Sequence, residues 1–312
     1  MDDIISRVIP ILALIFIGYI INKKSYLSQT TVNELKKGIV NVALPAVLLI
    51  TFMTMELRAE YFWVAIGTFF LLTLLYIAGA LLEKVKGVGH PILPFILSTF
   101  TFGLLGIPLF NSVFGIENLD KLSVLGIGHE FFVWFVMLTL LKMKFNGEGF
   151  SFAVIKGFAK SPLILSIVLG LFINILSINI ILENNPLFNG IMNTIEYFSV
   201  IATPIILIIV GYGLKLDPHY VKDSIRLVGL RIGVIFVIGY IIKSVLLNPL
   251  MGEDPMFDHA FFTFLILPPP LSMPLFIGEN STQEHSNLAN NVVVLNTIVT
   301  IIIFIVYVLM MT

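Results

Sequence analysis

Two proline-rich strings, residues 106–110 and 268–276, interrupt stretches that are otherwise apolar enough to cross a lipid bilayer. Both contain the sequence Pro-Leu-Phe, which begins at Pro108 in the first string and at Pro274 in the second. Proline removes a backbone donor and clashes with the preceding helical turn, and carbonyls freed inside hydrocarbon need a polar partner or water. A matched pair of interrupted spans therefore points to the binding site of a secondary transporter.

The residues around these prolines are suited to binding an anion. Helix N-termini at the interruptions would present free N–H groups and a partial positive charge, both of which favour a carboxylate. Glycine and small hydroxyl side chains permit unwinding and close approach of the backbone. We predict that one half of the site consists of Thr101, Gly103 and Pro108, and the other half of Pro269, Pro270, Ser272 and Pro274.

Ionisable side chains inside the predicted spans are few, and such residues are functional candidates. At about 1.5 Å per residue, His129 and Glu130 lie roughly 12 Å into their span. Glu130 is predicted to line the site and to carry a proton, with a purely structural role as the alternative. Neighbouring positions on a helix point about 100° apart, so His129 is expected to face a different partner. Arg231 is expected to extend to a membrane surface.

Two asparagines complete the predicted site. Asn296 lies 22 residues after Pro274, and Glu130 lies 22 residues after Pro108. The equal spacing predicts that Asn296 and Glu130 occupy equivalent positions near the two interruptions. Asn296 is expected either to line the site or to hydrogen-bond between helices without touching substrate. Asn41, in the second predicted span, is a further candidate for the wall of the site.

The elements that must position these residues are predicted to be membrane-spanning helices. The chain is 58% hydrophobic and 12% charged, with a mean hydropathy of +1.02, whereas soluble domains carry about 25% charged residues. A net charge of −1 gives no electrostatic support for a nucleic-acid partner. The sequence has no cysteine, no nucleotide-binding loop and no metalloprotease motif. We therefore expect no enzymatic activity, no catalytic residue, no metal and no cofactor.

Ten segments are long and apolar enough to cross about 30 Å of hydrocarbon. They comprise residues 4–22, 38–56, 61–82, 92–115, 122–142, 161–182, 191–214, 225–247, 257–278 and 287–310. The longest connection, residues 143–160, could form a short amphipathic helix on the membrane surface. Lys and Arg divide 14 to 4 between alternate sides of these spans. The positive-inside rule then predicts that both termini lie outside the cell and that the 143–160 linker is cytoplasmic.

Ten spans with a central linker suggest two halves of five, residues 1–142 and 161–312, joined by residues 143–160. Residues 42–48 resemble residues 201–207, which supports a repeat. Because five is odd, the second half would enter the membrane from the opposite side. The pattern therefore predicts an inverted repeat, a frequent basis for alternating access.

These residues resemble the auxin efflux carrier family, which includes plant PIN-type carriers and bacterial malate-permease-like members. The resemblance covers nearly the whole chain and is most specific at residues 106–109 and at Pro269 followed five residues later by Pro274. Glu130, four residues before Trp134, falls where plant members carry glutamine before a Trp-Tyr pair. The resemblance implies an all-α membrane protein of ten helices in a 5+5 inverted repeat, with broken helices four and nine crossed as in the bile-acid-transporter-like fold. It also implies a scaffold of helices one, two, six and seven, an elevator-type movement of the rest, and often a homodimer.

Two positions depart from the family pattern. Thr101 stands where many members have a substrate-contacting asparagine, and Glu130 stands where plant members have glutamine. A carboxylate beside an anion would repel it unless it were protonated or paired with a cation. We therefore predict a proton-coupled secondary transporter of small organic anions, malate-like or auxin-like, in the lipid bilayer of the cell (inner) membrane. The alternatives are a sodium-coupled symporter on the same fold, and a channel or membrane sensor.

Overall fold

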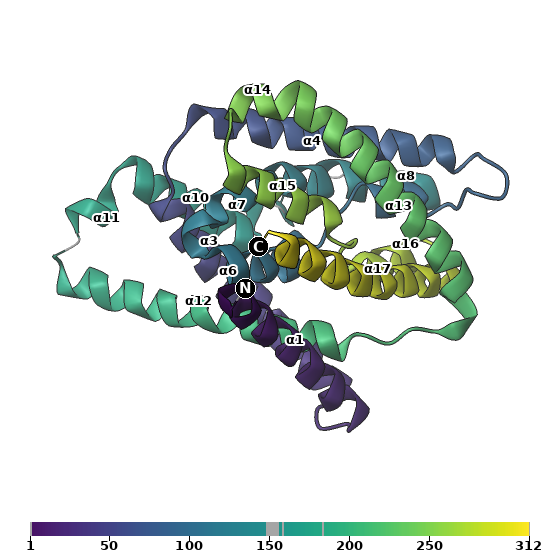
Figure 1. The fold of residues 1–312 in the computed structure, drawn as a ribbon, viewed down its shortest axis with the longest axis horizontal. Helices are drawn as coiled ribbons and strands as arrows, with labels where there is room; N and C mark the ends of the chain where they lie inside the picture. The colour runs from purple at the N-terminus through teal and green to yellow at the C-terminus, as the bar shows by residue number, and fades with distance from the viewer. Residues whose placement is uncertain (1, 148–155, 158, 183, 312) are drawn as a thin grey trace.

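The computed structural model describes residues 2–147, 156–157, 159–182 and 184–311 of the chain (Figure 1). All regular structure in these residues is helical. Seven of the described helical stretches are long and apolar enough to cross a membrane. These stretches are Gln29–Thr54, Ala59–Leu82, Leu93–Phe114, Ile116–Asn146, Pro186–Tyr212, Pro218–Met251 and Gln283–Met310. The expectation of an all-α fold is confirmed, and the seven apolar helices support that of a membrane protein. The ten-helix 5+5 repeat stays a prediction, and the surface helix predicted within 143–160 falls largely outside the described residues.

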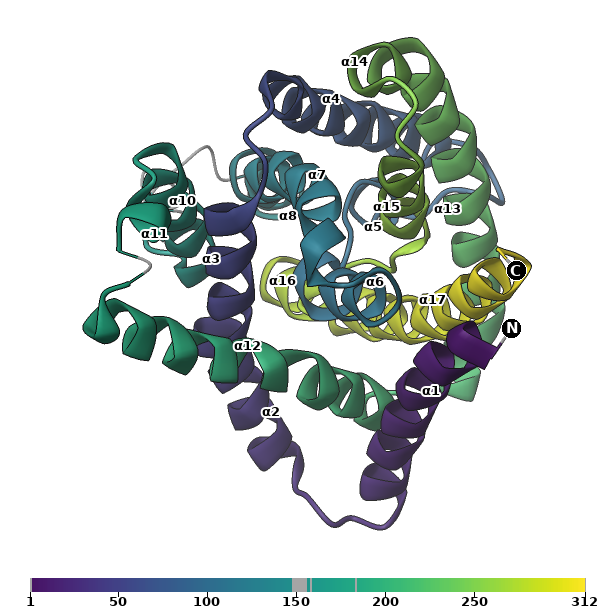
Figure 2. The same cartoon turned by 60° about the vertical axis from the view of Figure 1, so that its left-hand side comes forward.

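One group of helices, here called the frame, lies along the left and lower sides of Figure 2. It consists of α1 (Asp2–Lys23), α2 (Gln29–Gly38), α3 (Leu44–Thr54), α10 (Pro162–Ile175), α11 (Ile178–Ile181) and α12 (Pro186–Tyr212). Within it, α1 packs along α12, α10 packs along α3, and α12 crosses α3.

Glycines allow the frame helices to approach closely. A Cβ at Gly18 would lie 2.0 Å from the carbonyl oxygen of Ile208, and a Cβ at Gly211 would lie 1.9 Å from that of Ile15. The backbones of α1 and α12 are therefore in direct contact at two positions, as is common where helices associate in membranes.

The remaining helices, here called the core group, pack mainly on one another. They are α4 (Ala59–Leu82), α5 (Leu93–Leu97), α6 (Ile107–Phe114), α7 (Leu119–Phe132), α8 (Leu138–Asn146), α13 (Val221–Ile242), α14 (Asn248–Met251), α15 (Pro255–Ile266), α16 (Met273–Asn280) and α17 (Gln283–Met310). The frame touches this group chiefly through α6, which packs on α1 and α12, and through α7, which packs on α3.

Two helices of the core group are broken. The first break, residues 98–101, separates α5 from a helical run that starts at Phe102, and the second, residues 267–272, separates α15 from α16. The second break coincides with the string of prolines. The first does not: it lies before Pro108, through which the chain runs as continuous helix. The sequence-based prediction that the 106–110 string interrupts its helix is therefore wrong in position.

Wider helical turns precede three of the prolines in the helices. Three single π-helical turns, Ile39–Ala43, Phe102–Gly106 and Lys243–Leu247, each end two residues before a proline. A π-turn bonds residue i to i+5 and so moves aside the carbonyl with which a proline ring would collide. The proline then needs no break in the helix, and the unwound residues lie elsewhere.

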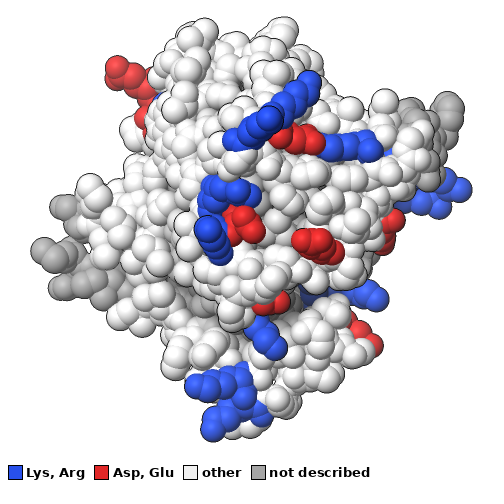
Figure 3. Space-filling model, turned by 90° about the vertical axis from the view of Figure 1, so that its right-hand side faces the viewer, with Lys and Arg blue, Asp and Glu red and all other residues white. Residues whose placement is uncertain are grey.

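Lys and Arg side chains, with several carboxylates, gather on the end of the molecule that Figure 3 shows. The loop between α4 and α5 lies at this end, to the right in Figure 1. Lys144 contacts Glu83 and donates to the carbonyl oxygen of Pro91 at 2.9 Å. The ring of His90 lies 5.1 Å from that of His285, at the start of α17. These contacts hold the loop against α8 and α17.

His90 makes this end sensitive to acid. Burial, and then the facing His285 and Arg226, lower the pKa of His90 from 6.5 to about 4. The unfolded chain therefore takes up this proton at a higher pH than the folded protein. The stability that neutral His90 confers is complete above about pH 6.5 and is lost as the pH falls toward about 4.

We expect the thermal unfolding temperature of the detergent-solubilised protein to fall across this interval, and to fall less in a His90→Gln variant. The control is His219→Gln, at an exposed histidine, which should follow the unsubstituted protein. Equal falls in the His90→Gln variant and the unsubstituted protein would contradict this account.

Candidate functional site

The two helix breaks meet, and Thr101 joins them. Its backbone N–H donates to the carbonyl oxygen of Pro268 at 2.7 Å, and its hydroxyl donates to that of Pro269 at 2.6 Å. Thr101 is 4% exposed. Residues far apart in the sequence thus satisfy one another's backbone groups at the points where each helix has lost its own hydrogen bonds.

Arg231, from α13, binds both breaks at once. Its guanidinium group donates to the carbonyl oxygen of Thr99 at 3.0 Å, to that of Leu267 at 2.7 Å, and to that of Ile96. The charged carbon lies 4.7 Å from the centre of the Phe100 ring. The last carbonyls of α5 and α15 carry the negative ends of the helix dipoles, so a cation is favourable there.

The position of Arg231 corrects one sequence-based expectation. Its side chain is 1% exposed and does not extend to a membrane surface. Arg231 therefore does not lie in a positively charged loop. It should be left out of the 14 to 4 division of Lys and Arg residues from which the orientation in the membrane was predicted. Sequence reasoning missed this residue as part of the site.

His129, from α7, contacts the first break from another side. Its Nε2 atom accepts the backbone N–H of Phe100 at 3.0 Å. A neutral imidazole that accepts at Nε2 carries its proton on Nδ1. That Nδ1 atom lies 3.4 Å from Oε1 of Glu130. The two neighbouring side chains, expected to face apart, therefore touch.

Asn296 approaches the second break through Thr300, one turn along α17. The Asn296 amide lies 3.4 Å from the Thr300 hydroxyl, which donates to the carbonyl oxygen of Ile266 at 2.5 Å. The Asn296 side-chain oxygen is buried and has no hydrogen-bond partner among the described residues. Such an atom is available to a water molecule or a ligand.

The other predicted residues lie at varying distances from this junction. Gly103 faces the frame, where an added Cβ would lie 3.4 Å from a methyl carbon of Leu44. Asn41 is exposed and donates to a carbonyl of its own helix, so nothing brings it to the breaks. The others accept hydrogen bonds locally: Pro108 from Ser112, Pro270 from Met273, Ser272 from Leu275, and Pro274 from Ser286.

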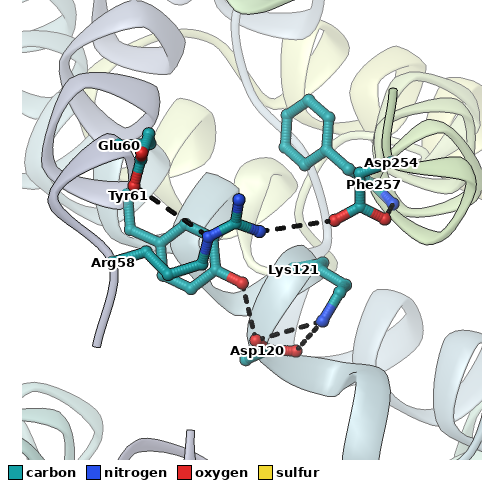
Figure 4. Close-up of polar contacts among 7 residues, drawn as sticks. All are labelled: Arg58, Glu60, Tyr61, Asp120, Lys121, Asp254 and Phe257. Carbon is teal, nitrogen blue, oxygen red and sulfur yellow. Dashed lines mark hydrogen bonds and ion pairs between the residues drawn. The ribbon is translucent and has the colours of Figure 1, made fainter. Parts of the chain in front are cut away.

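A separate polar network joins three helices of the core group where α4, α7 and α15 begin (Figure 4). The Tyr61 hydroxyl donates to Asp120 at 2.7 Å, and Lys121 donates to the same carboxylate at 3.1 Å. Arg58 lies 3.7 Å from Asp254, which caps α15. All the charged groups in this network have partners of opposite sign, so the network stabilises the packing of α4, α7 and α15.

A cavity of about 700 Å³ lies between the frame and the core group. Residues of α3, α4, α7 and α10 form its walls, among them Phe52, Phe69, Ile127 and Leu171. The walls are almost wholly apolar, and none of the predicted site residues lines them. The cavity separates the two helix groups on this side of the molecule.

No protein-family model matches the chain, and no curated protein matches it. The resemblance to the auxin efflux carriers therefore rests on the sequence strings quoted above. The class that fold and composition establish is a helical protein with several apolar helices able to cross a membrane.

Proposed function

We propose that the protein is a secondary transporter of small organic anions. The observation that carries this proposal is the meeting of two helix breaks, held by Thr101 and capped by Arg231. Paired broken helices that meet inside the bilayer are the usual location of substrate sites in such carriers. Ordinary structural helices have no need of this arrangement, which costs several backbone hydrogen bonds.

The charge distribution favours an anion. Arg231 places a full positive charge beside the carbonyl ends of α5 and α15. At the start of α16, Met273 and Leu275 donate their N–H groups to Pro270 and Ser272, and Pro274 has no N–H, so the positive charge at the junction comes from the guanidinium group. The guanidinium charge therefore sets the sign of the local field. A carboxylate is the simplest organic group that this field attracts.

An elevator-type movement is supported by the division into frame and core group. In the predicted order of spans, α1 is the first and packs on the seventh, α12; α10 is the sixth and packs on the second, α3. A five-helix repeat relates the first span to the sixth and the second to the seventh. A contact between the first and seventh spans would then have its counterpart between the sixth and the second, and these two contacts support the proposed repeat. The apolar cavity and the limited contacts between the groups support a proposed sliding of the core group along the frame.

Proton coupling is supported by the contact between His129 and Glu130. A second proton on His129 would place its Nε2–H against the N–H of Phe100 and break that hydrogen bond. We propose instead that the coupling proton is carried by the Glu130 carboxylate, whose Oε1 lies 3.4 Å from Nδ1 of His129. Neutral Glu130 no longer repels an anion, so proton and substrate bind together.

Uptake by proteoliposomes tests the function. We expect saturable, counterflow-capable uptake of at least one of a panel of mono- and dicarboxylates that includes malate and indole acetate. Flux without counterflow would indicate a channel, and uptake that requires Na⁺ at fixed pH would indicate a sodium symporter.

Thr101→Val is expected to lower this uptake about tenfold or more, because loss of the hydroxyl leaves a buried carbonyl unpaired at a cost of about 1–3 kcal/mol. Thr101→Ser keeps the hydroxyl and should retain most of the activity. The matched control is Thr68→Val, at a fully buried threonine that bonds only within α4. Uptake by Thr101→Val equal to that of Thr68→Val would argue against a role for the junction in transport.

A further inference from the structure

Arg231 has the environment of a bound metal cation, without the metal. Its acceptors are backbone carbonyl oxygens from both breaks: Ile96 and Thr99 on one side, Leu267 on the other. It forms no ion pair with a carboxylate among the described residues. Its side chain is 1% exposed, so water does not solvate the charge.

Converging carbonyl oxygens are the ligands that membrane proteins use for alkali cations. Carbonyls of unwound segments and the C-terminal ends of half-helices replace the hydration shell of Na⁺ in carriers, as carbonyl rings do for K⁺ in channels. A buried guanidinium group satisfies the same oxygens with a fixed charge and a planar set of donors. The ring of Phe100 covers the group at 4.7 Å and adds a cation–π contact.

We propose that Arg231 is a tethered cation that takes the place of a coupling Na⁺ between the two breaks. The junction then keeps its positive charge and its geometry throughout the transport cycle. Substrate can bind without waiting for an ion to assemble the site, and uptake is independent of Na⁺. This inference rests on the proposed function for its consequence in transport, but the cation site itself is testable without any substrate.

The first test measures thermal unfolding of the purified protein in sodium chloride and in choline chloride at equal ionic strength and pH. The unsubstituted protein should unfold at the same temperature in both salts. Arg231→Ala should unfold about 10 °C lower in choline, because the carbonyls lose their donors. Part of that loss should return with Na⁺ or with millimolar guanidinium, either of which can enter the vacated space.

Arg226→Ala is the matched control. Arg226 lies five residues earlier on the same helix, where it is partly exposed and pairs with Asp223 at 3.0 Å. This variant should show neither the large loss nor a response to either cation. An Arg231→Ala variant that behaves like Arg226→Ala would overturn the proposal, and so would unsubstituted protein that Na⁺ stabilises.

Arg231→Lys keeps the proposal testable if Arg231→Ala does not fold. Lysine retains the charge but presents a compact ammonium group in place of the planar fork. We expect an intermediate unfolding temperature and no response to Na⁺, whereas Na⁺-dependent stabilisation of this variant would contradict a tethered cation. If no carboxylate is transported, the proposed function fails, while the unfolding experiments still decide the nature of the cation site.

Discussion

Glu130→Gln is expected to abolish the accumulation of substrate that a pH gradient drives. A gradient of one pH unit supplies about 1.4 kcal/mol per coupled proton, which permits about tenfold accumulation of substrate. The variant should still exchange substrate across the membrane, because glutamine has nearly the shape of a protonated glutamate. Its uptake should therefore level off at the equilibrium concentration, with or without the gradient.

The expected loss of proton coupling follows from the contacts that His129 makes at the first break. His129 accepts the N–H of Phe100 through Nε2, and its Nδ1 atom lies 3.4 Å from Oε1 of Glu130 without a hydrogen bond between them. Of this pair, only the carboxylate can accept a further proton without disturbing the break. Glutamine cannot accept it, so movement of substrate and proton becomes uncoupled.

Glu196→Gln is the control, at an exposed glutamate in α12 that the same substitution neutralises. It should accumulate substrate as the unsubstituted carrier does. The measurement is uptake by proteoliposomes as a function of the imposed gradient. Gradient-driven accumulation that persists in Glu130→Gln would exclude Glu130 as the proton carrier.

The second large effect is expected when one methyl group is added to the frame at Gly211. A Cβ at Gly211 would lie 1.9 Å from the carbonyl oxygen of Ile15 and 2.7 Å from its carbon, and both atoms belong to the backbone of α1. Neither can move without displacing that helix. Gly211→Ala should therefore destabilise the protein by about 3 kcal/mol, at the upper end of the cost of overpacking, which corresponds to an unfolding temperature lower by roughly 10 °C.

Gly190→Ala provides the matched comparison in the same helix. Nothing lies within 4 Å of a Cβ at Gly190, and alanine is a better helix former than glycine by about 1 kcal/mol. This variant should unfold at a slightly higher temperature. The unfolding temperatures of both variants are measured in detergent. If the two substitutions shift the unfolding temperature in the same direction, α1 and α12 are not in backbone contact at Gly211.

Much of the helical architecture was predictable from composition. Long apolar stretches predict helices because a bilayer leaves the backbone no other partner, and the proline string at 268–274 predicts the break before α16. The first break could not be located this way. Its residues, 98–101, include no proline, and the π-turn before Pro108 removes the clash that made that proline look disruptive.

The depth of Arg231 was also hidden from the sequence. The apolar stretch in the sequence starts at residue 225, six residues before the arginine, whereas α13 starts at Val221. Arg231 lies only five residues after the exposed Arg226 on this helix, but its side chain is turned inward by its hydrogen bonds to Thr99 and Leu267. Nor could spacing reveal that three carbonyls would converge there, because they come from two other helices.

The bond between Thr101 and Pro269 has a consequence for how the protein is made. Its partners are 168 residues apart in the chain, which at about 5–20 residues per second represents roughly ten to thirty seconds of synthesis. During that time α5, α6 and His129 have been made, but Arg231 and the carbonyls of Pro268 and Pro269, which also bond to the first break, do not yet exist. The nascent N-terminal half must therefore be sheltered by lipid headgroups, water or the insertion machinery until Arg231 and Pro269 emerge from the ribosome.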